Sequence, residues 1–253
     1  MSVPAQPAAL SIRGASKRFG AVTALDDVDL DVRRREVLAL LGDNGAGKST
    51  LIKCISGAHR FDSGTVEMNG ETVAIHSPAA ARSLGIETVY QDLALFDNLK
   101  PSENFYAGRE LGSPRWLPKS LRILRRRRMR EATQDVLDRL QVSLPDLDSD
   151  VGLMSGGQRQ AVAVSRAAAF ASKVVILDEP TAALGLREAR KVLDLIRRLR
   201  DDGRAVIVIS HAMDHVMQVA DRVVVLRHGR KVGDLTPSPE THAQIESLIV
   251  GGD

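Results

Sequence analysis

Short apolar runs separated by turn residues fill the first third of the chain. Residues 28–32 alternate apolar side chains with aspartates, which is typical of a strand with one buried face. Val37–Leu41 is apolar throughout and predicts a strand that is covered on both faces. Thr65–Met68 and Thr72–Ile75 flank Asn69-Gly70, and this dipeptide between two short runs predicts a β-hairpin. The pattern therefore predicts mostly strands here.

The middle of the chain, residues 92–152, has a helical pattern instead. Asn98–Arg109 and Lys119–Leu140 each repeat apolar positions every three or four residues, which predicts two helices. Ser155–Phe170 predicts a further helix, rich in alanine and valine. We therefore expect a helical insertion between two strand-containing parts.

Strands and helices alternate again in the last third of the chain. We expect buried strands at Gly85–Tyr90, Lys173–Asp178 and Arg204–Ser210, an amphipathic helix at Leu186–Asp202, a closing hairpin of Arg222–Leu226 and Lys231–Asp234, and a helix near residues 239–250. This alternation predicts an α/β fold with a mainly parallel sheet. Residues 1–9 match no such pattern, and we expect them to form a flexible tail.

Composition narrows the class of protein only modestly. The 253 residues carry a net charge of +3, which is weak support for a nucleic-acid partner. The N-terminus lacks the pattern of a signal peptide, and no apolar run approaches the ~20 residues that span a bilayer. The single cysteine, Cys54, excludes an internal disulfide bond. We expect a cytoplasmic protein that reaches a membrane only through a partner.

The clearest chemical motif is Gly42-Asp43-Asn44-Gly45-Ala46-Gly47-Lys48-Ser49, which lies between a predicted strand and a predicted helix. It fits the P-loop pattern G-x-x-x-x-G-K-[ST]. Glycines let backbone N–H groups approach phosphate oxygens, and the helix that follows directs its positive end at the same anions. Lys48 is placed for the β- and γ-phosphates, and the Ser49 hydroxyl for Mg²⁺. The alternative is a loop that merely connects strand to helix.

Two further motifs supply acids and amides. Val174–Leu177 is an apolar strand that ends in Asp178-Glu179, and such acids lie beside a P-loop when the strands of one sheet end at the same edge. Asp178 would hold Mg²⁺ and Glu179 would polarise the attacking water; alternatively, both acids cap the next helix. Ser155-Gly156-Gly157-Gln158 places an N-cap serine and two glycines before a helix, which makes a second anion site.

Five features occur in a characteristic order along residues 10–245. They are the P-loop, Gln91 after a strand, Ser155-Gly156-Gly157-Gln158, Asp178-Glu179 and His211. Together they resemble the nucleotide-binding subunit of ATP-binding cassette (ABC) transporters. Kinases and other P-loop NTPases share the first motif and lack the Ser-Gly-Gly-Gln signature.

The resemblance implies a fold and a set of roles. The fold would be a P-loop NTPase (RecA-like) core with a mainly parallel sheet, an N-terminal antiparallel β subdomain and an α-helical subdomain. A single domain would cover residues 10–250, with the core and β subdomains at 10–91 and 171–250 and the helical subdomain at about 92–170. The implied ATP-binding residues are Phe19, Gly42, Asp43, Asn44, Gly45, Ala46, Gly47, Lys48, Ser49 and Thr50. The implied Mg²⁺ ligands are Ser49, Gln91 and Asp178, and the implied catalytic residues are Glu179, His211 and Gln91.

Three of these roles depend on the resemblance. Phe19 would stack on adenine, Gln91 would contact Mg²⁺ or the attacking water, and His211 would contact the γ-phosphate. Without the resemblance, they would be a core phenylalanine, a surface glutamine and a loop histidine. The signature residues Ser155, Gly156, Gly157 and Gln158 would complete the ATP site of the opposite protomer, so the resemblance implies a head-to-tail homodimer.

Gly42–Gly47, Gln158–Ala167 and Glu179–Gly185 are similar to monosaccharide importers of the ribose, xylose and fructose type. This implies an ATP-hydrolysing subunit at the inner face of the cell membrane, with transmembrane permease subunits and, indirectly, a substrate-binding protein as partners. Gly185 departs from the aspartate of many members, so contacts across the dimer through that residue are not expected. The sugar itself is not encoded in this chain.

Other interpretations remain open at this point. A non-transport ABC ATPase of the DNA-repair type needs a long coiled coil, and the interval from Gln91 to Ser155 is too short for one. A nucleotide-gated regulatory module without turnover is disfavoured by Glu179. Export instead of import also remains possible. The basic segment Leu121–Arg130 is either a solvated helix face or a surface for anionic lipids or an acidic partner.

Overall fold

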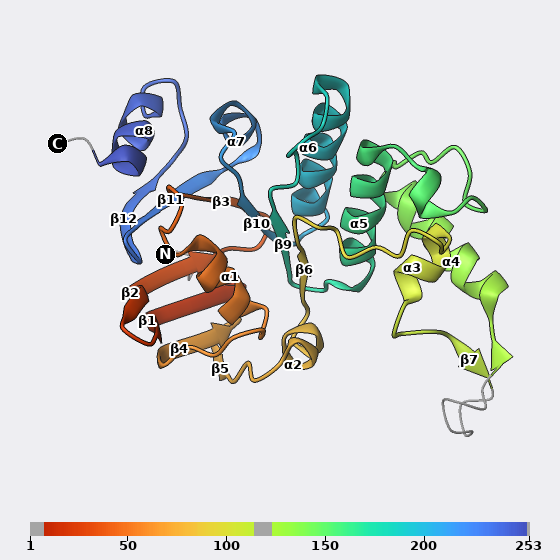
Figure 1. Cartoon of the computed structure of the whole chain (residues 1–253), viewed down its shortest axis with the longest axis horizontal. Coiled ribbons are helices and arrows are strands. Elements are labelled where there is room, and N and C mark those ends of the chain that lie inside the picture. Colours follow the sequence, from red (N-terminus) through yellow and green to blue (C-terminus); the bar gives the residue numbers. More distant parts are fainter. Residues whose placement is uncertain (1–7, 114–122, 252–253) are drawn as a thin grey trace, which may run out of the picture.

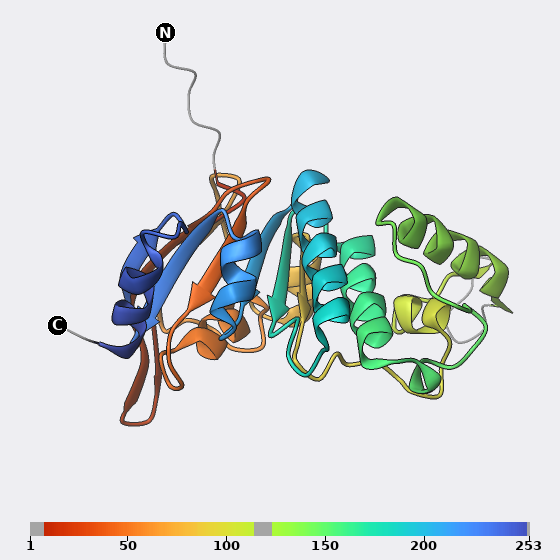
Figure 2. The same ribbon diagram turned by 90° about the horizontal axis from the view of Figure 1, so that it is seen from above.

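The computed structural model describes residues 8–113 and 123–251. An antiparallel sheet and a mixed central sheet lie next to each other, and a group of helices follows them along the long axis of the molecule (Figures 1 and 2). The P-loop lies where the first two parts meet. The α/β architecture expected from the sequence is therefore confirmed.

The central sheet has six strands in the order β12-β11-β3-β10-β9-β6. The strands are β3 (Val37–Leu41), β6 (Ile86–Val89), β9 (Val174–Asp178), β10 (Ala205–Ile209), β11 (Arg222–Arg227) and β12 (Arg230–Leu235). All neighbours are parallel except β11 and β12, which form the expected closing hairpin. The β3 side chains are all buried, as the continuous apolar run predicts.

The second sheet is antiparallel, with the order β2-β1-β4-β5. Its strands are β1 (Leu10–Phe19), β2 (Val22–Val32), β4 (Ser63–Met68) and β5 (Glu71–Val73). Asn69 and Gly70 have φ values of 54° and 84°, which is the left-handed pair that a tight hairpin requires. The hairpin prediction is confirmed.

Helices cover both faces of the central sheet and form the remaining part. They are α1 (Lys48–Ile55), α2 (Pro78–Ser83), α3 (Pro101–Tyr106), α4 (Arg126–Arg139), α5 (Gly156–Phe170), α6 (Leu186–Asp201), α7 (Met213–Val219) and α8 (His242–Val250). Within the described residues, no helix is long and apolar enough to cross a bilayer.

Three sequence predictions need correction. The helix expected at 119–140 begins at Arg126, because β8 (Ile123–Leu124) pairs with β7 (Gly112–Ser113) instead; residues 119–122 lie outside the described residues. The helix expected at 98–109 is limited to α3. Ala9, expected in a flexible tail, is buried, and its carbonyl accepts a hydrogen bond from the Asn69 amide at 3.3 Å; residues 1–7 of that tail are outside the description.

The core divides into layers because side chains alternate along each strand. On β9, Val174 and Ile176 pack toward α1, whereas Val175 and Leu177 pack against α5 and α6. The single cysteine, Cys54, lies in α1 and is buried. Burial raises the pKa of its thiol to about 11.

Arg222, the first residue of β11, connects three segments that are distant in sequence. Its guanidinium donates to Glu36 Oε1 at 2.7 Å, to both Asp234 oxygens at 3.0 Å and to the Asp31 carbonyl. Burial alone would lower the pKa of Arg222. The hydrogen bonds and negative charges of Glu36 and Asp234 outweigh burial and raise it. Removal of this cation would leave the Glu36 carboxylate buried without its partner.

We expect Arg222→Ala to lower the free energy of unfolding by about 3 kcal/mol, because a buried carboxylate loses its counter-charge. Arg13→Ala is the matched control: Arg13 pairs with Asp31 on an exposed surface, where such a pair contributes less than about 1 kcal/mol. Urea unfolding followed by circular dichroism measures both. Equal losses in the two variants would contradict the structural role of Arg222.

We expect the Cys54 thiol to resist thiol–disulfide exchange in the folded protein at pH 8, because only the thiolate attacks a disulfide and burial disfavours the thiolate. In urea the same thiol becomes accessible and ionises near its ordinary pKa. Reaction with a chromogenic disulfide reagent, followed with and without urea, measures the difference. Fast stoichiometric reaction of the folded protein would show that this part of α1 opens readily.

Candidate functional site

The loop between β3 and α1 is shaped by backbone that approaches it from two other strands. Gly42 and Gly47 have φ values of 146° and 103°, which few other residues adopt. A Cβ on Gly42 would lie 2.2 Å from the Leu226 carbonyl oxygen, and one on Gly47 would lie 2.6 Å from the Ala24 carbonyl oxygen. Both positions therefore require glycine, for conformation and for space.

Lys48 is the first residue of α1 and curls back over this loop. Its Nζ donates to the carbonyl oxygens of Gly42 at 2.6 Å and Asp43 at 3.0 Å. Burial lowers the pKa of Lys48, and the nearby Glu179, Asp43 and Asp178 oppose that change. The ammonium is thus held where the loop amides and the N-terminus of α1 also favour an anion.

Asp178 and Glu179 end β9 beside this ammonium. Asp178 pairs in register with Ile209 of β10, and the Glu179 amide donates to the Ile209 carbonyl at 2.9 Å. Burial, with the adjacent Glu179 charge, raises the pKa of Asp178, while Lys48 acts in the opposite direction. The Lys48 ammonium therefore balances only part of the negative charge of these two adjacent acids.

Glu179 has an unusual conformation and a specific partner. Its φ is 50°, in the left-handed region that non-glycine residues rarely occupy. Its Oε1 lies 2.9 Å from Nδ1 of His211, the second residue after β10. The Glu179 side chain is only 15% exposed, whereas that of His211 is 78% exposed. The carboxylate is fixed in place while the imidazole faces the solvent of the cleft.

These groups share one cleft of about 460 Å³ at the ends of the strands. Its lining includes Gly42, Asp43, Asn44, Lys48, Glu179 and His211. The structure thus brings together half of the P-loop residues, the second acid and the histidine that the sequence singled out, whereas Asp178 lies outside this lining. Ser49 and Thr50 continue the first turn of α1 directly behind Lys48.

Phe19 and Gln91 lie outside that lining. Phe19 ends β1 with a 45% exposed ring, whose edge packs against His59 at a centroid distance of 5.3 Å. It is therefore not a core residue. Gln91 is exposed just beyond the end of β6, the strand next to β9. Both residues are exposed to solvent, although the Phe19 ring also lies 5.5 Å from the Lys17 ammonium.

An arginine from a distant helix holds the segment that follows Gln91. Arg166, in α5, donates to the carbonyl oxygens of Leu93 at 3.0 Å and Ala94 at 2.7 Å. Leu93 and Ala94 have φ values of 60° and 46°. Burial lowers the pKa of Arg166. Sequence reasoning missed this link, because nothing in the local pattern connects residue 166 with residue 93.

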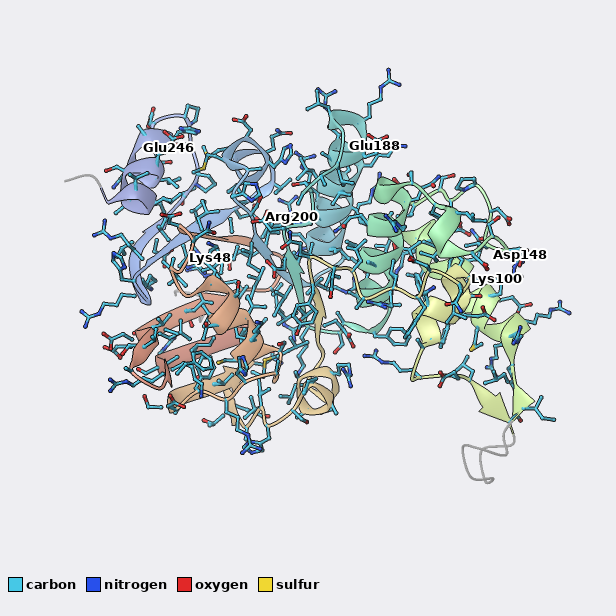
Figure 3. The ribbon with its side chains drawn as sticks, in the orientation of Figure 1. Lys48, Lys100, Asp148, Glu188, Arg200 and Glu246 are labelled. Carbon is cyan, nitrogen blue, oxygen red and sulfur yellow. The ribbon has the colours of Figure 1, made fainter. Side chains whose placement is uncertain are left out.

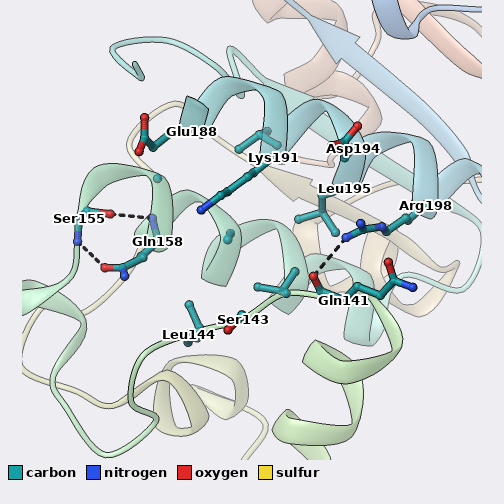
Figure 4. A pocket seen from close by; sticks show the side chains of 14 residues that line it. Gln141, Ser143, Leu144, Ser155, Gln158, Glu188, Lys191, Asp194, Leu195 and Arg198 are labelled. Carbon is teal, nitrogen blue, oxygen red and sulfur yellow. Dashed lines mark hydrogen bonds between the residues drawn. The ribbon is translucent and has the colours of Figure 1, made fainter. Parts of the chain in front are cut away.

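The Ser-Gly-Gly-Gln motif forms the start of α5. The Ser155 hydroxyl accepts from the Gln158 amide at 3.3 Å, and the Gln158 side chain accepts from the Ser155 amide at 2.8 Å (Figure 4). This is a reciprocal capping box. Gly157 packs against α6, where a Cβ would lie 2.6 Å from the Glu188 Cγ. The cap explains serine and glutamine, and the close helix packing explains the second glycine.

The motif is remote from the P-loop of the same chain. None of its residues lines the cleft at Lys48, and Figure 3 shows Lys48 and Glu188, which adjoins Gly157, well apart. Ser155, Gly157 and Gln158 instead border a separate pocket of about 320 Å³ between α5, α6 and the segment 141–144 (Figure 4). Within one chain, the P-loop and the Ser-Gly-Gly-Gln motif therefore border different pockets.

His215 is a further polar residue whose partner was not evident from the sequence. Its Nδ1 lies 2.9 Å from Oγ1 of the buried Thr181, so the turn after Glu179 is tied to α7 directly after His211. No local sequence pattern connects His215 with Thr181, 34 residues away.

Comparisons with known proteins agree with this geometry. The family model described as ABC transporter matches residues 25–182, more than half of the chain. The chain is 46% identical to a fructose import ATP-binding protein of Rhizobium meliloti, over 98% of this chain and 95% of that protein. It is 49% identical to a xylose/arabinose import ATP-binding protein of Sulfolobus acidocaldarius, over 87% of this chain and 85% of the relative.

Among solved structures, a nucleotide-free ATP-binding cassette from an ABC transporter is similar to this fold. It superposes with a TM-score of 0.81 at 26% identity, over 96% of this chain and 97% of that structure. The matched family segment contains both the glycine loop and the Ser-Gly-Gly-Gln motif. The chain is therefore a member of the ABC transporter family.

Proposed function

We propose that the chain is the ATP-hydrolysing subunit of a sugar importer. The observation that carries this proposal is the juxtaposition of Glu179 and His211, 2.9 Å apart, at the edge of the cleft that contains Lys48. A phosphate chain held by the loop amides and Lys48 would present its last phosphate to this pair. No binding-only function requires a fixed carboxylate beside an exposed imidazole at that position.

The chain's residues would divide the reaction as follows. The loop amides and Lys48 bind the phosphates and stabilise charge on the leaving side. Glu179 orients the attacking water and accepts its hydrogen bond, because its carboxylate is fixed by burial and by His211. His211, whose exposed imidazole lies beside Glu179, would contact the γ-phosphate. Hydrolysis would depend mainly on position and on charge stabilisation.

The donor atoms at the cleft fit Mg²⁺. Ser49 and Asp178 offer oxygen ligands, which this ion prefers, and Gln91, which follows the strand next to β9, would supply a side-chain oxygen from the same edge of the sheet. Asp178 and Glu179 carry adjacent negative charges that a divalent cation would balance. No cluster of three or more acids, histidines or cysteines within the described ranges holds a metal alone. Mg²⁺ would therefore bind together with ATP, where it neutralises phosphate charge.

A head-to-tail homodimer would unite the two motifs that one chain keeps apart. Ser155 and Gly156 are exposed at the N-terminus of α5. Leu153 and Leu186, on either side of this motif, are 83% and 78% exposed, which is unusual for large aliphatic side chains. In a dimer, this surface would cover the ATP bound at the partner's P-loop. Gly185 offers no side chain to that interface, so Leu186 would make the neighbouring contact.

The sugar and the membrane partners are inferred from relatives. The two relatives above are import ATP-binding proteins for fructose and for xylose or arabinose. We therefore propose a monosaccharide as cargo, transmembrane permease subunits as direct partners and a substrate-binding protein as an indirect one. The chain would work at the inner face of the cell membrane. The helical subdomain at about 92–170 would meet the permease near Phe96, whose ring is 55% exposed.

We expect Glu179→Gln to reduce phosphate release from Mg-ATP by about 10²- to 10⁴-fold, because the variant lacks the base that orients water. The same variant should retain ATP and accumulate as a dimer, which light scattering detects. Glu246→Gln, on α8, is the matched control and should leave both properties unchanged, since Glu246 only pairs with His242. Equal phosphate release by wild type and Glu179→Gln would exclude Glu179 as the catalytic carboxylate.

We expect Asp178→Asn to raise the melting temperature of the nucleotide-free protein, because burial and the Glu179 charge disfavour the ionised form. The variant should lose most of the additional stabilisation that Mg-ATP gives over ATP with a chelator. Asp135→Asn, an exposed change on α4, is the control and should alter neither value. Differential scanning fluorimetry with both ligand mixtures measures these effects. A retained Mg²⁺-dependent gain in Asp178→Asn would contradict its role as a ligand.

A further inference from the structure

The first turn of α4 carries an exposed cluster of arginines that the nucleotide cleft does not use. Arg125–Arg128 and Arg130 are exposed, whereas Met129 between them is buried and anchors the helix. The cluster lies beside β7 and β8, at the opposite end of the molecule from α8 and far from the P-loop (Figures 1 and 2). Nucleotide binding and dimer formation through α5 therefore leave this surface free.

The protein's own acids balance only part of this charge. Glu103 lies 3.3 Å from Arg126, Glu131 lies 2.9 Å from Arg127, and Asp148 lies 3.1 Å from Arg130 and 3.7 Å from Lys100. Asp148 thus pairs with two cations, Arg130 and Lys100. Figure 3 labels Asp148 and Lys100. Arg125 donates to the Ser113 hydroxyl, and Arg128 forms no ion pair with any described residue.

The position of the cluster on its helix is unfavourable for the isolated fold. The first turn of α4 contains no acid, and its N-cap, Arg125, has no side-chain cap. Cations at a helix N-terminus oppose the helix dipole, so the stability of the helix does not explain them. Bound anions would satisfy both the arginines and the free amides of the first turn. Arg125–Arg128, Leu124 and Glu131 line a shallow, open hollow of about 530 Å³ that can receive such groups.

Aliphatic side chains accompany the arginines. Ile123 and Leu124 of β8 are 78% and 46% exposed, directly before the cluster. A bilayer surface offers phosphate groups above an apolar layer, which matches arginines beside exposed aliphatic residues. A nucleic acid would instead favour a longer basic stripe or exposed stacking rings. We propose that residues 123–130 bind the anionic phospholipid headgroups of a membrane surface, with Ile123 and Leu124 entering the interface.

This contact would hold the subunit on the bilayer beside its permease. It deepens the proposed function by adding a direct lipid contact, but it requires no nucleotide and no turnover. Failure of lipid binding and failure of ATP hydrolysis are therefore separate results.

The experiment is flotation of the purified full chain with lipid vesicles. The wild type should float with vesicles that contain phosphatidylglycerol and remain in solution with phosphatidylcholine alone, and high salt should abolish flotation. Arg126→Gln/Arg127→Gln/Arg128→Gln should bind about a hundredfold more weakly, at roughly fivefold per arginine near an anionic surface. Ile123→Ser/Leu124→Ser should weaken flotation with phosphatidylglycerol vesicles at low salt, because it removes the apolar contact and leaves the arginines in place.

A matched control is available in the exposed triplet Arg33–Arg35, between β2 and β3. Replacement of all three by glutamine removes the same charge and should leave flotation unchanged. Equal losses in the two triple variants would overturn the proposal, because net charge alone would then explain binding. Absence of wild-type flotation with anionic vesicles would also overturn it.

Two further outcomes identify a different ligand. Inorganic phosphate at the same ionic strength as sodium chloride should compete no better than the chloride; complete competition by phosphate would show a free-anion site and overturn the membrane assignment. Fluorescence anisotropy with a short DNA duplex tests nucleic acid. Tighter binding of the duplex than of the vesicles, lost in the 126–128 variant, would assign the cluster to nucleic acid instead.

Discussion

The register of three parallel strands places the candidate catalytic groups of this protein. Leu40 of β3 and Asp178 of β9 both pair with Ile209 of β10, so the three strands end in one row. The acidic pair begins in that row with Asp178, the P-loop and His211 follow shortly beyond it, and a one-residue slip in any strand would turn its last side chain to the opposite face of the sheet. Because apolar side chains cover both faces of these strands, packing on two sides fixes the register. The geometry of the cleft is therefore a consequence of how the core packs.

Sequence reasoning succeeded where a local pattern carried the information. The continuous apolar runs of β3, β9 and β10, the Asn69-Gly70 turn and the glycine loop are each determined by neighbouring residues. It missed β1, whose pairing with β2 contains several register shifts that interrupt the alternation. It extended α4 too far toward the N-terminus, because the short β7–β8 pairing joins segments whose individual patterns are also compatible with helix.

The candidate site likewise combines parts that a local sequence pattern predicts with parts that only the packed structure shows. The P-loop, Asp178-Glu179 and Ser155–Gln158 are contiguous motifs, so their chemistry could be inferred before the fold was known. The positive φ of Glu179 and its distance to His211 depend on how β9 and β10 end, which no single segment encodes. Arg166 and His215 act through partners that are distant in sequence or on another element. Long-range contacts of this kind emerge only from the packed structure.

Helix α5 joins the two halves of the site through three polar attachments. Its first turn is closed by Ser155 and Gln158, Arg166 in its middle holds the backbone after Gln91, and Arg204 donates to the carbonyl oxygens of Ala168 and Ala171 at its end. Because Arg166 holds the loop at two carbonyl groups, a movement of α5 would also move the loop. If α5 tilts when a second copy closes on its N-terminus, the forked guanidinium of Arg166 must pull the carbonyls of Leu93 and Ala94 along. Closure of a second copy on the N-terminus of α5 would therefore also move the backbone that follows Gln91, beyond the edge strand β6.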